Sequence, residues 1–195
     1  MYYLLKIRDR SNYGGILLVI YTSYIEVFDA AKNFRDLSYE HWISSELFTF
    51  DWWFLLIISI IPWVIWWKLF DKNRKTTIIM FGLFIALFSV TFEYIGEHIA
   101  LWWGYKTRLF PVLTFIVPFD LTFLPVVFML VYQFFNNWRS FLKGMLMLSF
   151  GGAFIFEPLL HWMDIYILYT WKYIYSMPIY FFMGLFFKWL VEKIN

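Results

Sequence analysis

The stretch TIIMFGLFIALFSVTFEYIGEHIALWW, which runs from Thr77 to Trp103, decides the fold class of this chain. It is longer than the ~20 apolar residues that a helix needs to cross a hydrocarbon core of about 30 Å. Inside lipid every backbone amide must bond within its own segment, and the residue alternation typical of a membrane β-barrel is absent. The stretch therefore predicts a transmembrane helix.

Four more apolar stretches extend this prediction to a bundle, although the last of them is a little short. They run from Trp52 to Leu69, Leu109 to Phe135, Phe141 to Trp162 and Met177 to Leu190. Of the 195 residues, 62% are hydrophobic and 15% are charged, whereas an average soluble domain has about 45–50% and about 25%. We therefore expect an all-α, polytopic transmembrane helical bundle with five firm spans and the lipid bilayer as its main partner.

A further segment, from Tyr13 to Phe28, has the character of a signal anchor. It is apolar, and three cations precede it: Lys6, Arg8 and Arg10. This order is typical of a signal sequence, but Asp29 stands where cleavage would require a small residue. We therefore expect an uncleaved sixth span. The alternative is a helix that lies on the membrane surface, which Glu26 near the end of the segment supports.

The distribution of Lys and Arg favours six spans with both termini in the cytoplasm. In that topology 11 cations lie inside, namely Lys6, Arg8, Arg10, Lys68, Lys72, Arg74, Lys75, Arg139, Lys143, Lys188 and Lys193. The outer 5 are Lys32, Arg35, Lys106, Arg108 and Lys172. If the first segment does not span, the count becomes 8 against 8, and the excess of cytoplasmic cations disappears.

The region before the five firm spans contains one more element. Between Asp36 and Phe50, apolar residues recur near helical spacing, which predicts an amphipathic helix at the outer membrane interface. Residues 1–51 would then hold the signal-anchor-like segment and this interfacial helix, and residues 52–195 would form the five-span bundle. No internal repeat or linker marks a further domain.

Charge and cysteine content exclude several classes of function. The net charge of +2 is small and spread along the chain, so nucleic-acid binding has no electrostatic basis. The absence of cysteine excludes disulfides, thiol catalysis and thiolate metal sites. Nothing in the composition indicates a particular protein partner.

Seven ionisable residues form a candidate polar site in the membrane. They are Glu93, Glu97, His98, Asp120, Glu157, His161 and Asp164. A charge at the centre of a span costs roughly 2.5–3.5 kcal/mol, so several together require an explanation. At 1.5 Å per residue all seven fall in the outer half of the bilayer, and at ~100° per residue most of them share two helix faces. We expect both faces to point into the bundle or into a water-filled cavity.

The charge of this group needs compensation, because five carboxylates face only two imidazoles. Some carboxyls could stay neutral, or the outer cations Lys106, Arg108 and Lys172 could fold inward. A divalent metal ion is the third possibility. Its candidate ligands are Glu93, Glu97, Glu157 and His161, since the last two lie one helical turn apart.

Four motifs resemble an uncharacterised family of multi-pass membrane proteins from endospore-forming bacteria. They are PFDLTFLP at 118–125, MLVYQ at 129–133, EPLLHWMDIY at 157–166 and WKYIYSMP at 171–178. The resemblance covers roughly Trp42 to the C-terminus, and the first forty residues depart from the family pattern. It implies a multi-pass protein of the bacterial plasma membrane. Since the family has no established activity, it implies no substrate.

Three functions are compatible with these features. The cluster could bind a cation or relay protons in a small transporter or channel subunit. It could instead be catalytic, with a metal-activated water or a protonated Glu that acts on a lipid or isoprenoid. In the third hypothesis the protein is a scaffold and the cluster fixes helix packing. Whether the chain is an enzyme is left open by the sequence.

Overall fold

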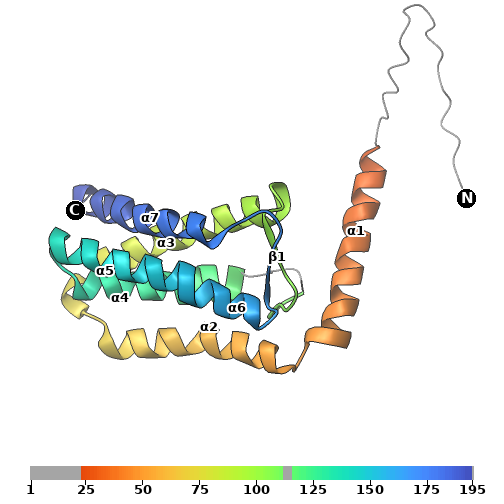
Figure 1. The fold of residues 1–195 in the computed structure, drawn as a ribbon, viewed down its shortest axis with the longest axis horizontal. Helices are drawn as coiled ribbons and strands as arrows, with labels where there is room; N and C mark the ends of the chain where they lie inside the picture. Colours follow the sequence, from red (N-terminus) through yellow and green to blue (C-terminus); the bar gives the residue numbers. More distant parts are fainter. Residues whose placement is uncertain (1–22, 112–115, 195) are drawn as a thin grey trace, which may run out of the picture. The chain divides into compact units, whose positions relative to one another are not determined.

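The computed structural model describes residues 23–111 and 116–194 (Figure 1). Most of the segment expected to form a sixth span, 13–22, lies outside the described residues. The chain divides after Phe34 into two units.

The first unit contains the start of helix α1, which runs from Tyr24 to His41. The Ser23 hydroxyl accepts from the amide of Glu26 at 3.2 Å, and the Glu26 carboxylate accepts from the amide of Ser23 at 2.7 Å. This reciprocal capping box starts a helix. Glu26, which suggested a surface location, is thus the residue that caps α1.

The second unit begins within α1 and contains the other elements. A π-helical turn, Trp42–Glu46, extends α1, so the helix expected from Asp36 to Phe50 exists but begins earlier and ends sooner. The remaining elements are α2 (Phe50–Leu69), α3 (Lys75–Tyr94), β1 (Trp103–Tyr105), α4 (Leu124–Phe134), α5 (Trp138–Gly151), α6 (Glu157–Trp162), β2 (Tyr166–Leu168) and α7 (Tyr173–Ile194).

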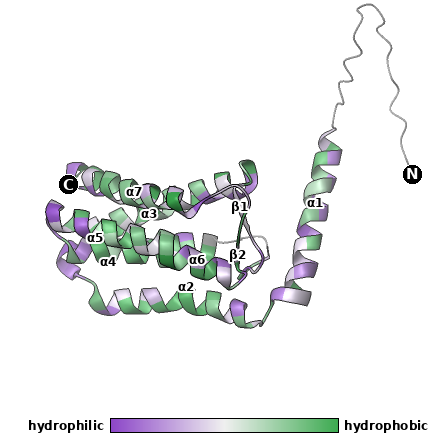
Figure 2. Ribbon diagram, viewed as in Figure 1, coloured by the Kyte–Doolittle hydropathy of each residue, from purple (hydrophilic) through white to green (hydrophobic). Residues whose placement is uncertain are grey.

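Five helical segments of this unit are long and apolar enough to cross a membrane, which confirms the predicted helical bundle. They are Phe50–Leu69, Lys72–Ile99, Val117–Phe134, Trp138–Trp162 and Tyr173–Ile194. Figure 2 shows hydrophobic residues along most of their length. The last span was expected to be short, but α7 has 22 residues because it begins at Tyr173.

Two ends of the bundle can be distinguished by the order of the spans. At one end β1 pairs with β2 in antiparallel register, with Tyr105 opposite Tyr166; we call it the sheet end. At the other end, the C-terminal end, α2 turns into α3, α4 turns into α5, and α7 finishes (Figure 1). Helix α7 packs against both α3 and α5, and α3 also packs against α4.

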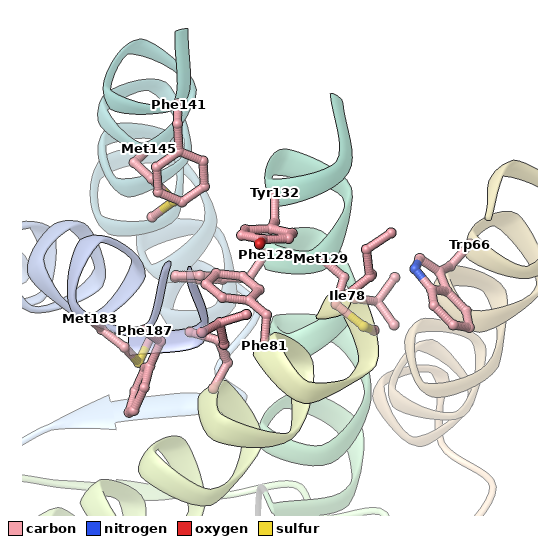
Figure 3. Close-up of a cluster of buried hydrophobic side chains, with 13 residues drawn as sticks. Trp66, Ile78, Phe81, Phe128, Met129, Tyr132, Phe141, Met145, Met183 and Phe187 are labelled. Atoms are coloured by element: carbon pink, nitrogen blue, oxygen red, sulfur yellow. The ribbon is translucent and has the colours of Figure 1, made fainter. Parts of the chain in front are cut away.

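Aromatic side chains fill the half of the bundle nearer the C-terminal end. The Phe81 and Tyr132 rings stack with centroids 4.5 Å apart, and Phe141 meets both edge-on. Figure 3 shows these residues from α3, α4 and α5 gathered with Met183 and Phe187 of α7. This core holds the spans together at the C-terminal end, and a second cluster, which includes Leu55, Trp103 and Phe119, packs the sheet end.

Candidate functional site

Three of the seven predicted site residues line one cavity toward the sheet end. Glu93 at the end of α3, Asp120 before α4 and Glu157 at the start of α6 all border a space of about 330 Å³. The rest of the lining is mainly aromatic and apolar, and includes Phe88, Phe92, Trp103, Phe119, Phe123, Phe156, Trp171 and Met183. A mostly apolar cavity with a few convergent polar groups is typical of a small-molecule site.

Each of these carboxyls lies in or beside a π-helical turn that interrupts its span. Ile95–Ile99 follows Glu93, Ile116–Phe123 contains Asp120, and Gly152–Phe156 precedes Glu157. Such turns insert an extra residue into the helix and occur frequently at functional sites. In three spans, therefore, the α-helix is interrupted next to the carboxyl that lines the cavity.

Glu93 is held by the strand β1. The indole Nε1 of Trp103 donates to Glu93 at 2.9 Å, and the Tyr105 hydroxyl donates to the same carboxyl. The Trp103 ring can approach because Gly96 has no side chain, and a Cβ there would lie 2.1 Å from the ring. The short sheet therefore positions one of the three acids.

Glu157 is held by α7. The Ser176 hydroxyl donates to it at 2.9 Å and the Tyr180 hydroxyl at 2.7 Å. The indole of Trp171 donates in turn to the Ser176 hydroxyl at 2.9 Å. Glu157 is only 6% exposed, so these two hydroxyls replace the water that a buried carboxyl loses.

Asp120 differs from the other two acids. It is also 6% exposed, but its Oδ2 has no hydrogen-bond partner among the described residues. The charges close enough to act on it are the carboxyls of Glu93 and Glu97, which have the same sign. A buried oxygen without a donor costs about 1–3 kcal/mol, so Asp120 is the least satisfied group of the cavity.

Two tyrosines of the sheet complete the polar lining. Burial raises the pKa of the Tyr105 hydroxyl well above its usual value of 10, and the charge of Glu93 adds to the shift. Burial likewise raises the pKa of Tyr166, with smaller contributions from Glu157 and Glu93. Their rings stack with centroids 5.4 Å apart. Both hydroxyls therefore stay protonated at physiological pH, and that of Tyr105 donates to Glu93.

The other four predicted residues do not line the cavity. Glu97 lies 3.7 Å from the imidazole of His98, which stacks on the ring of Tyr94. His161 is exposed and meets the ring of Tyr173 edge-on. Asp164 forms an ion pair with Lys106 at the surface of the sheet end. Of the seven predicted residues, three therefore line the cavity and four lie outside it.

The four candidate metal ligands are not gathered. Within residues 23–111 and 116–194, which include all four, no three His, Asp or Glu side chains are placed to hold a metal ion. Glu93 is bonded to β1 and Glu157 to α7, whereas His161 lies beside Tyr173. The structure gives the metal interpretation no support.

The outer cations do not fold into the cavity, contrary to one of the possibilities raised by the sequence. Lys106 pairs with Asp164, Arg108 pairs with Glu46 at 2.7 Å, and Lys172 is exposed. As far as the described residues form it, the cavity wall contains three carboxyls and no Lys, Arg or His.

The Glu46–Arg108 pair was not predicted. Glu46 is buried, and the indoles of Trp42 and Trp52 donate to the carbonyls of Arg108 and Leu109 at 3.0 and 3.1 Å. No local pattern could have found a pair separated by 62 residues. Ser176 and Tyr180, by contrast, could have been found from the sequence, because they are polar residues one helical turn apart in an apolar span.

Comparison with protein-family models, with curated proteins and with solved structures gives no match. The resemblance to a family of endospore-forming bacteria therefore stays a prediction from the four motifs.

Proposed function

We propose that this chain is a multi-pass protein of the bacterial plasma membrane that binds an organic cation in the cavity at the sheet end. The observation that carries the proposal is the composition of the cavity wall, in which three carboxyls and several aromatic rings converge without a Lys, Arg or His from the part of the chain that the structure describes. Ionised carboxylates that line the same cavity repel one another, and a positively charged ligand would relieve that repulsion.

The aromatic rings favour an organic cation over an inorganic one. Carboxylates and aromatic faces together are the elements that recognise an ammonium group. A small metal ion would need several oxygen or nitrogen ligands at short range, and the cavity offers mainly carbon. The volume of about 330 Å³ also lies at the lower end of the range of ligand pockets.

The chain itself contains an ammonium bound in this manner. Lys188 is buried near the C-terminal end, with its Nζ 2.7 Å from Glu192. The same Nζ lies 4.7 and 4.9 Å from the ring centroids of Tyr132 and Phe141. The cavity at the sheet end offers the same two kinds of partner to a ligand.

The distribution of cations supports the orientation of the site. Eight Lys and Arg lie at the C-terminal end of the spans, namely Lys68, Lys72, Arg74, Lys75, Arg139, Lys143, Lys188 and Lys193. The loops at the sheet end carry three, Lys106, Arg108 and Lys172, and two more, Lys32 and Arg35, precede the first described span. With the sixth span expected from the sequence, which puts Lys6, Arg8 and Arg10 inside, the positive-inside rule favours a cytoplasmic C-terminal end and a cavity in the outer half of the membrane.

Calorimetric titration with tetramethylammonium chloride tests the proposal, with the protein in phosphatidylglycerol nanodiscs. We expect saturable binding to the wild type, and affinity lower by about tenfold or more in Asp120→Asn and Glu157→Gln, because each removes a charge from a desolvated site. Asp164→Asn is the matched control, since this acid lies outside the cavity, and it should bind as the wild type does. Sodium chloride at equal concentration corrects for ionic strength.

Binding that is not saturable, or that is equal in all four proteins, would refute the proposal.

A further inference from the structure

An apolar groove lies beside the cavity, on the seam between α3 and α7. It has a volume of about 380 Å³ and is lined by Phe88, Pro178, Ile179, Phe182, Met183, Phe186 and Phe187. Phe182 and Phe186 are 64% and 53% exposed. Since α3 and α7 both belong to segments suited to cross a membrane, these exposed rings would face lipid.

The groove and the carboxyl cavity share part of their walls. Phe88, Ile179 and Met183 line both spaces. Beside this shared wall the Ser89 hydroxyl approaches the Met183 sulfur at 4.0 Å. Methionine is unbranched and adapts its shape readily, so the shared wall contains a side chain that can move to join the two spaces.

The other seam of α7 is built differently. On the side of α5, a Cβ at Gly184 would lie 2.4 Å from the end of the Met145 side chain. A Cβ at Gly152 would lie 3.3 Å from the Tyr180 ring. Helix α7 is therefore packed closely against α5, whereas on its seam with α3 an apolar groove lies open.

The two adjoining spaces are complementary in chemistry. The cavity supplies carboxyls and the groove supplies only apolar side chains. A molecule that occupied both would need a positively charged head and a hydrocarbon tail. A purely water-soluble cation would leave the groove unused.

We propose that the ligand of this site is a cationic amphiphile of the membrane, with its head among Glu93, Asp120 and Glu157 and its alkyl tail in the groove between α3 and α7. The inference rests on the proposed function, because the carboxyls must first bind a cation. It adds the class of ligand and a route of entry from the lipid, between the two helices.

Photolabelling tests this inference with a dodecyltrimethylammonium probe that carries a diazirine at the end of its chain. The full chain is placed in phosphatidylglycerol nanodiscs, and labelled residues are mapped by mass spectrometry. We expect labels at Phe182 and Phe186, and few at Leu146, a lipid-exposed residue of α5 that serves as reference.

Labelling of the groove should fall about tenfold or more in Asp120→Asn, because loss of a charge that binds the head releases the tail. Excess tetramethylammonium should have the same effect, since it competes for the head. Asp164→Asn should label as the wild type does. This set of results would support the inference.

Two results would overturn it. If label spreads evenly over α5 and α7 while tetramethylammonium still binds in a carboxyl-dependent manner, the cavity binds a cation but the groove holds no tail. If groove labelling is unchanged in Asp120→Asn, the groove holds hydrocarbon independently of the carboxyls. Absence of both carboxyl-dependent binding and carboxyl-dependent labelling would instead refute the proposed function itself.

Discussion

At the C-terminal end of the bundle a buried ammonium is paired with a carboxylate of the chain, whereas at the sheet end three carboxyls line a cavity whose described wall holds no cation. Lys188 is 2% exposed, and Glu192 and three aromatic rings surround its Nζ. Glu93, Asp120 and Glu157 also lie among aromatic rings, but their cavity wall holds no cation in the described parts of the chain.

The comparison separates charges that serve the fold from charges that would serve a ligand. Neighbouring polar groups at the C-terminal end are also paired, as Gln133 shows: its Nε2 donates to the Leu69 carbonyl at 2.6 Å and its Oε1 accepts from the Asp71 amide at 3.0 Å. Proteins accept unmatched buried charge mainly where function requires it. Substitutions should therefore act in opposite directions at the two ends.

The largest effect is expected from Glu192→Gln, which leaves the Lys188 ammonium buried without its carboxylate. Removal of one partner of a fully buried pair costs about 3–5 kcal/mol, and because Glu192 is 39% exposed we expect about 2 kcal/mol. Lys188→Met should cost less, since it removes the buried charge and packs an apolar chain against the rings. Denaturant unfolding in micelles measures both.

The order of these two variants is the decisive result. If Lys188→Met is the more destabilising, the interactions of the ammonium contribute more free energy than its desolvation costs. The loss of a charge partner would then not explain the effect of Glu192→Gln, and the contrast with the cavity would fail.

Asp120→Asn should have the opposite sign and a smaller size. In the ligand-free protein it removes a buried acid group whose Oδ2 has no donor among the described residues and which lies near the carboxyls of Glu93 and Glu97, so we expect a gain of about 1 kcal/mol in unfolding free energy. The same variant should lose ligand binding. Asp164→Asn, which breaks an exposed ion pair with Lys106, should be neutral or slightly destabilising. A loss of stability in Asp120→Asn would mean that the carboxyl is structural.

The spans could be predicted because they depend on apolar length alone. Glu93, Asp120 and Glu157 were assigned to the outer half of the bilayer from the rise per residue, and their side chains were expected to point into the bundle. They do line one cavity inside the bundle. Their position in the outer half of the membrane stays a prediction.

The direction in which each side chain points around its helix axis could not be predicted, because the π-helical turns change it. The faces were derived from 100° per residue, but Glu97 and His98 lie in the π-helical turn Ile95–Ile99, where the rotation per residue differs from that of an α-helix. Helix α6 ends at Trp162, and Asp164 has a left-handed backbone with φ of 61°. Asp164 therefore does not lie on the same helix face as Glu157. These departures depend on tertiary packing, which no sequence period records.

The smallest effect concerns Asp71, a partly buried carboxyl at the C-terminal end. Its Oδ2 accepts from Arg74 Nε at 2.9 Å and its Oδ1 accepts from the Asn73 amide at 3.0 Å. These bonds, first that of Arg74, hold the pKa of Asp71 below its ordinary value of 3.8. A carboxyl whose pKa is lowered in the folded state stabilises the fold above pH 3.8, and this contribution is lost as the pH falls through the folded-state pKa.

An NMR titration of the Asp71 carboxyl carbon checks this prediction. The midpoint should lie below 3.8 in the wild type and rise toward it in Arg74→Gln, which removes the charged donor but keeps a side chain able to donate. An unchanged midpoint would show that the guanidinium does not hold this carboxylate in solution. Charge matching at the C-terminal end would then be confined to its buried pair, and the contrast with the cavity would rest on Lys188 alone.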